Sequence, residues 1–414
     1  MASVPSGGSL AAASPGAASL ATDSQFIARL VIYSFSLRLV IVLLLQATDA
    51  IYILRLSPDS ERYHRVGIEI ATQMAMGSWN SMGWIDNGWF QFTGLIYYLI
   101  GPIDWAMQLI NISLGVAIIP LGYRIFSQCT DDVIAARFYA ILLAFFPSLV
   151  YWSCLMLKDA VSTLAVVLVV FSVFEMRIRP AFRLAFPFAT GLLILLGTRE
   201  YLFTVLILLT PPALLLFPLL RKQSTPLVLI LAIMAAGAFP MLLGQGFFAS
   251  DYLLHSRYFD LEYINRTRIA MGDHGSGALF AQDNVHVWGE SVAGDIEAVL
   301  VTLSAILMPV NPFALASVRQ LIAVPFVVIM VASLWPMARG VMYGWRIRQL
   351  STPIGVITGG VLAVYVGGTT NAGALFRWTT QLMPFLLMAV AAGLFYRTDR
   401  LGYRLGVRVV ALVS

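Results

Sequence analysis

The chain has 414 residues, of which 59% are apolar and only 11% are charged, and its net charge is +5. Soluble domains average about 25% charged residues, so this composition excludes a water-soluble globular fold. The positive charge is therefore interpreted as arginines that anchor cytoplasmic loops, and no nucleic-acid partner is expected.

Apolar runs of about 20 residues each can cross the hydrocarbon core of a bilayer. Backbone groups in lipid must be hydrogen-bonded within their own segment, so helices are expected, and no alternating barrel strands are seen. The sequence predicts an all-α polytopic transmembrane bundle of about ten spans. In chain order these cover residues 30–51, part of 94–123, 133–152, 160–174, 184–198, 201–219, 227–243, 321–338, 354–367 and 379–396.

Outside these spans the chain divides into tails and loops. Residues 1–27, rich in Ala, Ser and Gly, predict a disordered cytoplasmic tail, residues 28–398 the membrane domain, and residues 399–414 a basic cytoplasmic tail. Two large outer loops are expected at 52–92 and 248–318. Tryptophans and polar residues in the first loop predict amphipathic helices in the headgroup layer, and residues 296–307 of the second predict an interfacial or re-entrant segment.

Arginine clusters recur at alternate loops, and the positive-inside tendency places them in the cytoplasm. Both termini then lie inside, and most acidic residues lie outside. Because acidic residues contribute little to insertion, their one-sidedness indicates a function on the outer side. The clusters are Arg124 with Arg137, Arg177 with Arg179 and Arg183, Arg221 with Lys222, Arg339 with Arg346 and Arg348, and Arg397 with Arg400, Arg404 and Arg408.

The first candidate site residues follow the first span directly. Pro58 can open a helix, with Asp59 in its first turn and Tyr63 on the same face. A carboxylate at the membrane surface could deprotonate a sugar hydroxyl, whereas the structural alternative is a helix cap with solvated charges. The other polar residues of this segment are Glu61, Arg62 and His64.

Further charges lie at the outer ends of later spans. Lys158 and Asp159 join two spans, and Lys158 is one of only two lysines against 24 arginines. A compact ammonium group could bind a membrane phosphate, while the alternative is a hinge whose charges reach the interface. The remaining candidates are the pair Arg199 and Glu200, and Asn371 with Arg377 at the entry to the last span.

Other chemistry is less well supported. Dinucleotide, nucleotide-phosphate and zinc-protease motifs do not occur at usable positions. A transporter would place ionisable residues at mid-membrane, and in the first span only Arg38 and Asp49 are candidates, both expected near its ends.

The order of these features resembles bacterial polyprenyl-phosphate-sugar-dependent glycosyltransferases of the GT-C superfamily, of the type associated with exopolysaccharide and O-antigen synthesis. The similarity spans residues 28–396 and rests on short motifs: the acidic segment after the first span, residues 94–101 (GLIYYLIG), the Phe-Pro-Ser…Trp-Ser…Lys-Asp stretch at 146–159, and a late Asn…Arg…Pro segment. The departure is that many members carry adjacent acids or a second acidic motif, which Asp159 and Glu200 match weakly.

The resemblance implies roles for these residues. Asp59 would be the general base, with Glu61 as second choice, and Lys158, Arg199 and Arg377 would hold the leaving phosphate. It implies a polyprenyl-phosphate-linked sugar as donor, a glycan or lipid-linked acceptor, and a site on the periplasmic side of the bacterial inner membrane. No metal ligand is identified, and the need for a divalent cation, Mg²⁺ or Mn²⁺, stays open. Supporting roles fall to Arg62, Tyr63, His64, Asp159, Glu200 and Asn371.

Two other functions stay in view. An oligosaccharide polymerase would depend on outer-loop arginines and would need no essential carboxylate. A lipid-linked glycan transporter would move its substrate without forming a new glycosidic bond.

Overall fold

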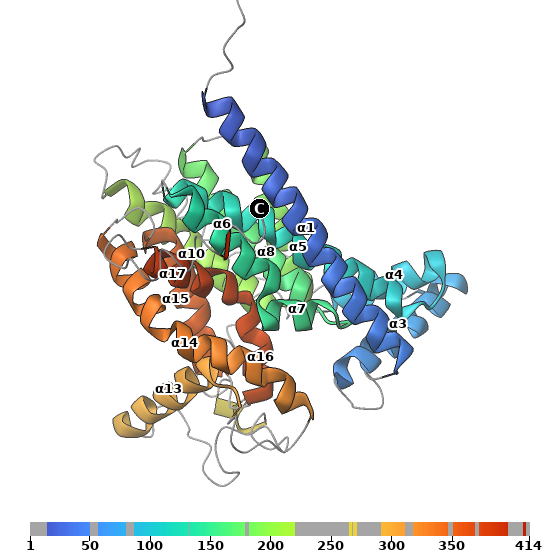
Figure 1. Ribbon diagram of the computed structural model, residues 1–414. Helices are drawn as coiled ribbons and strands as arrows, with labels where there is room; N and C mark the ends of the chain where they lie inside the picture. The colour runs from blue at the N-terminus through green and yellow to red at the C-terminus, as the bar shows by residue number, and fades with distance from the viewer. Residues whose placement is uncertain are drawn as a thin grey trace, which may run out of the picture.

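The computed structural model is a bundle of α-helices (Figure 1). The first helix begins at the top of this view. The structure describes residues 15–49, 57–79, 87–130, 132–178, 182–219, 265–266, 268–270, 291–310, 318–346, 351–368, 372–395 and 409–410.

Several helices are long and apolar enough to cross a membrane. Four of them contain such a segment: α1 (Pro15–Ala47), α5 (Asp104–Cys129), α8 (Asp159–Ile178) and α14 (Val318–Arg346). Two further candidates are bent pairs, and counting each as one span raises the number to six. These are α6 (Val133–Phe145) with α7 (Pro147–Ser153), bent by 44°, and α16 (Ala372–Trp378) with η4 (Thr379–Gln381) and α17 (Met383–Leu394), bent by 68°.

The described residues thus show a helical chain with four to six candidate spans, which indicates a multi-pass membrane protein, but they do not show the predicted ten. Three of the predicted spans correspond to helices with shorter apolar segments: α9 (Ala185–Thr198), α10 (Glu200–Leu219) and α15 (Ser351–Gly368). The span predicted at 227–243 lies outside the described residues.

The breaks in the bent pairs have a local cause. Proline has no backbone N–H and cannot continue a helical ladder, and Pro147 is the first residue of α7. Pro384 stands in the first turn of α17. The predicted spans 133–152 and 379–396 are therefore each divided into two helical segments.

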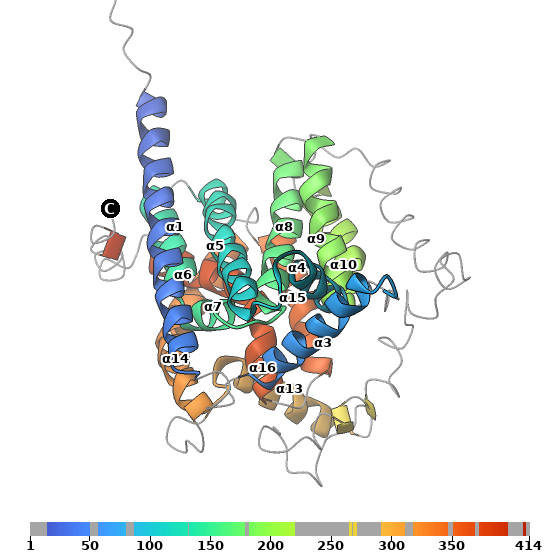
Figure 2. The same cartoon turned by 90° about the vertical axis from the view of Figure 1, so that its right-hand side faces the viewer.

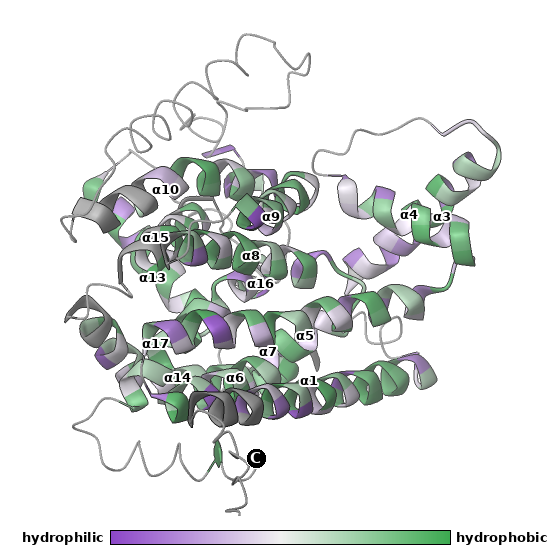
Figure 3. Ribbon diagram, turned by 90° about the horizontal axis from the view of Figure 1, so that it is seen from above, coloured by the Kyte–Doolittle hydropathy of each residue, from purple (hydrophilic) through white to green (hydrophobic). Residues whose placement is uncertain are grey.

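A helical hairpin projects to one side of the bundle in Figures 1 and 3 and lies in front of the bundle in Figure 2. It consists of α3 (Pro58–Ala75) and α4 (Gly88–Ile100). α3 lies within the first predicted outer loop, residues 52–92, whereas α4 continues to residue 100, into the segment predicted to contain the second span. The helices can approach closely because Gly67 faces Thr93, whose Cγ2 would lie 2.6 Å from a Cβ at position 67. The placement of this hairpin in a headgroup layer stays a prediction.

Contacts between helix ends define two opposite ends of the bundle. Near the start of α5, Asn111 contacts the carbonyl groups that precede α8. At the far end of the same two helices, Arg124 Nε lies 2.6 Å from Glu175 Oε1. Arg137 also lies at this far end, paired with Asp23 of α1 at 2.6 Å. These two arginines, predicted to be cytoplasmic, are therefore separated from the end of the bundle at which α8 begins.

Two segments are helical where the sequence predicts a tail or an interfacial stretch. The first helix begins at Pro15, within the predicted tail, and residues 296–307 belong to α13 (Val292–Leu307). Apolar residues run along most of α1 when the molecule is viewed from above (Figure 3). Arg38 interrupts them in the interior of the Asp23–Ala47 segment, so the expectation that it lies near a helix end is wrong, whereas Asp49 does follow the end of α1.

Candidate functional site

A cavity of about 350 Å³ opens at the end of the bundle where α8 begins. Its walls come from α3, α4, α16 and the junctions that precede α8 and α10. The four charged positions Asp59, Lys158, Arg199 and Arg377, far apart in the sequence, all line it. The remaining lining residues are Arg62, Tyr63, Asn87, Phe90, Ala374 and Trp378.

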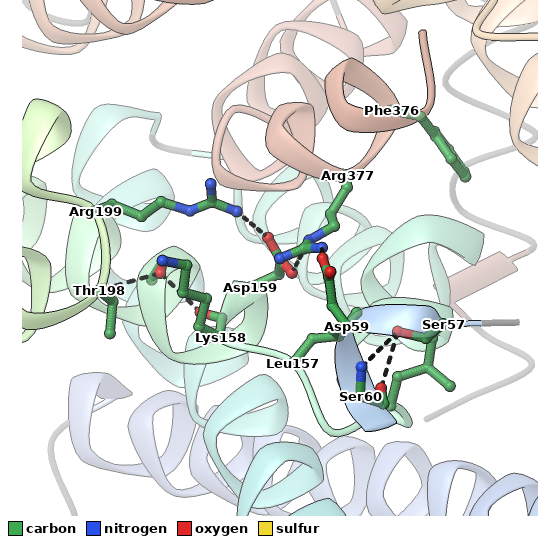
Figure 4. A network of polar contacts seen from close by, with 12 residues as sticks. Ser57, Asp59, Ser60, Leu157, Lys158, Asp159, Thr198, Arg199, Phe376 and Arg377 are labelled. Atoms are coloured by element: carbon green, nitrogen blue, oxygen red, sulfur yellow. Dashed lines mark hydrogen bonds and ion pairs between the residues drawn. The ribbon is translucent and has the colours of Figure 1, made fainter. Parts of the chain in front are cut away.

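The base of the site is an ion-pair cluster around Asp159, shown in Figure 4. Arg199 Nη2 donates to Asp159 Oδ1 at 2.7 Å, and Arg377 Nε donates to Asp159 Oδ2 at 2.5 Å. The Asp159 side chain is fully buried. Since both of its oxygens accept from guanidinium groups, Asp159 is the counter-ion of two arginines and is not placed to accept a proton from a ligand.

Asp59 has a different environment. Its Oδ2 accepts a hydrogen bond from Arg377 Nη1, so Arg377 bridges the two carboxylates. The side chain of Asp59 is 51% exposed, whereas that of Arg377 is 15% exposed. Asp59 is therefore the carboxylate of the cavity that an incoming molecule can reach.

Local structure explains how these side chains meet. Ser57 Oγ caps α3 by accepting from Ser60 N at 3.3 Å, which places Asp59 in the first turn. Asp159 begins α8, and Arg199 occupies the break between α9 and α10. Each charge thus stands at a helix end or junction, where side chains converge on one end of the bundle. Arg377 reaches the same point from the short helix α16.

Aromatic rings pack against the guanidinium group of Arg199. The Arg199 guanidinium lies over Trp378, 5.4 Å from the ring centroid, and 5.9 Å from that of Tyr201. Cation–π contacts of this kind fix the plane of the guanidinium group. Gln381 joins the cluster because its Oε1 accepts from Tyr365 Oη at 2.7 Å, while its Nε2 lies 3.5 Å from Asp159 Oδ1.

Tyr63 forms part of the wall beside Asp59. Burial raises the pKa of its phenol to about 12, and the charges of Arg377 and Arg199 offset this only in part. The phenol is therefore neutral at physiological pH and acts as a hydrogen-bonding group, not as a base. Its ring packs on Phe90 with centroids 4.8 Å apart.

The other predicted residues lie in varied places. Arg62 lines the cavity and lies over the Phe90 ring at 5.6 Å. Glu61 is exposed on α3 and does not line the cavity, and Glu200 is buried at the start of α10, also outside the lining. His64 Nδ1 lies 2.7 Å from Tyr97 Oη and joins α3 to α4. Asn371 lies outside the described residues.

The sequence pattern identified Arg62, Tyr63 and Asp159 as supporting residues, but it did not identify the other residues around the site. Trp378 and Gln381 follow Arg377 at one and four positions, so helical spacing from that arginine could have found Gln381, and adjacency Trp378. Tyr365, Asn87 and Phe90 carry no such signal. Their place in the site depends on how α15 and α4 pack, which the sequence pattern does not specify.

The charge of the site is positive. Counting Asp159, four cationic side chains face two carboxylates, which leaves a net charge of +2. Within the described ranges, no three His, Cys, Asp or Glu side chains come together as metal ligands. The arrangement can therefore bind an anion by charge and by guanidinium hydrogen bonds, with one accessible carboxylate beside it.

Comparisons with protein-family models, with curated proteins and with solved structures found no match for the chain. The residues and their geometry are therefore the basis for any functional conclusion. What they establish is a helical protein with several candidate membrane spans and a cationic cavity at one end of the bundle.

Proposed function

We propose that the protein is a membrane glycosyltransferase that moves a sugar from a polyprenyl-phosphate donor to a glycan or lipid-linked acceptor. One observation carries the proposal: the exposed carboxylate of Asp59 shares a cavity with Lys158, Arg199 and Arg377. A phosphate attached to a membrane lipid stays at the interface, and a cationic cavity at the end of a membrane bundle suits it. The family resemblance supports the same reaction.

In this reaction the acceptor hydroxyl oxygen attacks the anomeric carbon of the donor sugar. The bond between that carbon and the phosphate oxygen breaks, and its electron pair leaves with the phosphate. Asp59 takes the hydroxyl proton, a contribution of about 10²–10⁴-fold to the rate. Lys158, Arg199 and Arg377 stabilise the charge on the leaving phosphate, as fixed donors do in oxyanion sites.

The direct test uses purified protein in lipid nanodiscs with a polyprenyl-phosphate sugar and a glycan acceptor. We expect Asp59→Asn to lower turnover by about 10²–10⁴-fold. Glu61→Gln is the matched control, because Glu61 lies two positions away on the same helix, is exposed and does not line the cavity. If Asp59→Asn and Glu61→Gln both keep the turnover of the wild type, Asp59 is not the base.

An oligosaccharide polymerase is the second candidate, favoured by the two arginines that surround Asp159. It would depend on these arginines and would need no carboxylate base. Activity that survives Asp59→Asn but is lost in Arg377→Ala would favour the polymerase. Movement of a lipid-linked glycan across the bilayer without a new glycosidic bond would instead favour a transporter.

The proposed location is the bacterial inner membrane, with both termini in the cytoplasm and the cavity on the periplasmic side. It is supported by Arg124 and Arg137, which lie at the end of the bundle away from the cavity. Labelling with a membrane-impermeant thiol reagent tests it through cysteines introduced at Glu61 and at Arg183. We expect reaction from outside at position 61 and none at position 183.

A further inference from the structure

A stretch without helical structure ends at Lys158, which lines the cavity. It runs from Cys154 to Lys158, between the end of α7 and the start of α8. Its first four residues are at most 3% exposed. Buried backbone in a membrane protein must find hydrogen-bond partners outside a helix, so this stretch depends on neighbouring side chains.

Asn111 supplies such partners from α5. Its Nδ2 donates to Leu155 O at 2.6 Å and to Leu157 O at 2.8 Å, and the side chain is fully buried. One amide group thus fixes two carbonyl groups directly before Lys158. The position of Lys158 in the cavity therefore depends on Asn111.

Arg38 of α1 holds the helices on the preceding side of the stretch. Its Nε donates to Ser153 Oγ at 2.9 Å, at the end of α7, and its Nη1 donates to Ala144 O at 2.8 Å, beside the bend between α6 and α7. Ser34 Oγ donates to the same carbonyl at 3.0 Å. A positive charge is favourable near the last carbonyl groups of a helix, so Arg38 stabilises the end of α6.

The acceptors of Arg38 at these positions are neutral oxygens, although the side chain is fully buried within a candidate span. A charged side chain inside a membrane is unfavourable by several kcal/mol, and an apolar side chain would fill the same space without this desolvation penalty. The arginine is therefore explained by what it holds and not by packing. It connects α1 to the end of α6, beside the bend, and to the end of α7.

We propose that Arg38 and Asn111 are positioning residues for the cavity. Together they fix the path from α6 through α7 to the stretch before α8, and so set where the Lys158 ammonium group lies. Neither side chain lines the cavity. The inference rests on the proposed function, because it assigns these residues to the binding of the donor phosphate through Lys158.

The test measures the affinity of purified protein in nanodiscs for a polyprenyl phosphate. We expect Arg38→Gln and Asn111→Ala each to weaken binding by about tenfold, as residues that orient a ligand-binding group do. Arg38→Lys should recover part of the loss. Ser113→Ala is the control, because Ser113 is an exposed residue of α5 whose hydroxyl donates to Leu109 O, at 2.8 Å, within the same helix.

A double-mutant cycle separates positioning from a general loss of structure. In a Lys158→Ala background, Arg38→Gln and Asn111→Ala should have little further effect on affinity, since they act through Lys158. The inference would be overturned if the loss of affinity caused by Arg38→Gln or Asn111→Ala adds in full to that of Lys158→Ala. It would also be overturned if the folded single variants bind a polyprenyl phosphate as tightly as the wild type. If Arg38→Gln does not fold, Asn111→Ala decides by the same criteria. Wild-type protein that neither binds a polyprenyl phosphate nor transfers sugar would instead overturn the proposed function.

Discussion

Replacement of Asp159 by Asn tests the central ion-pair cluster most directly. The change keeps the shape of the side chain and removes its charge. Arg199 and Arg377, with side chains 6% and 15% exposed, would then share no buried counter-ion. The new amide nitrogen would also face a guanidinium donor, since both oxygens of Asp159 accept such bonds.

The magnitude follows from the burial of the carboxylate. Removing one partner of a buried ion pair destabilises a protein by about 3–5 kcal/mol, because a charge is left without compensation. We expect Asp159→Asn to lower the free energy of unfolding by this amount. The double variant Asp159→Asn with Arg199→Gln should recover about 0.5–3 kcal/mol, because it removes one of the two uncompensated charges.

The assay is denaturant unfolding of the purified protein in detergent micelles, with tryptophan fluorescence as the probe. Glu61→Gln serves as control, because an exposed substitution away from special features changes stability by less than about 0.5 kcal/mol. If Asp159→Asn unfolds within that margin of the wild type, the cluster does not stabilise the protein. The description of Asp159 as a buried counter-ion would then be refuted.

Three other predictions concern the walls of the cavity. Arg377→Lys keeps the charge but cannot bridge Asp59 and Asp159 with one planar group, so steady-state turnover should fall by about 10²-fold, and unchanged turnover would contradict the bridging role. Gly67→Ala should lower the free energy of unfolding by about 1–3 kcal/mol because its Cβ would meet Thr93 at 2.6 Å, whereas Gly359→Ala, with nothing within 4 Å, should not destabilise. The pKa of the Tyr63 phenol is raised from 10.0 to about 12 in the folded protein. The free energy of unfolding is therefore unaffected by this group below pH 10 and falls as pH rises toward 12, because the unfolded chain loses the phenol proton more readily. The wild type should lose about 3 kcal/mol more than Tyr63→Phe over that range in pH-dependent unfolding, and equal losses would contradict the assignment.

The sequence predicted the helical class and the site charges for different reasons. Long apolar runs report membrane spans directly, because the bilayer sets their length. Charges next to such runs are few, so Asp59, Lys158, Arg199 and Arg377 could be selected from the residue pattern alone. Successive helices that alternate in direction bring every second junction to the same end of a bundle, which is how these residues can converge.

The parts that the sequence did not predict depend on packing. Asp159 matches an acidic motif only weakly, but its two arginine partners make it a counter-ion. That role requires α8, α16 and the junction before α10 to meet at one point, which no local pattern encodes. The sequence predicts Arg38 near a helix end. Its interior position brings it to the carbonyl group of Ala144, beside a bend between α6 and α7 that the sequence pattern did not predict.

The contrast between the two carboxylates explains how one cavity could both bind and react. Arg199 and Arg377 repel each other, and the fully buried Asp159 offsets that repulsion without accepting a proton, because both of its oxygens are occupied. Asp59 has the opposite properties, since it is 51% exposed and shares only Arg377. An arriving phosphate would compete with Asp59 for Arg377, and the pair it replaces is weak, about 0.2–1 kcal/mol for partners with this degree of exposure. The same Asp59→Asn variant should therefore bind a polyprenyl phosphate as tightly as the wild type or up to about fivefold more tightly, even though its turnover falls. Weaker binding by this variant would mean that Asp59 helps to hold the phosphate site together and does not compete with the phosphate for Arg377.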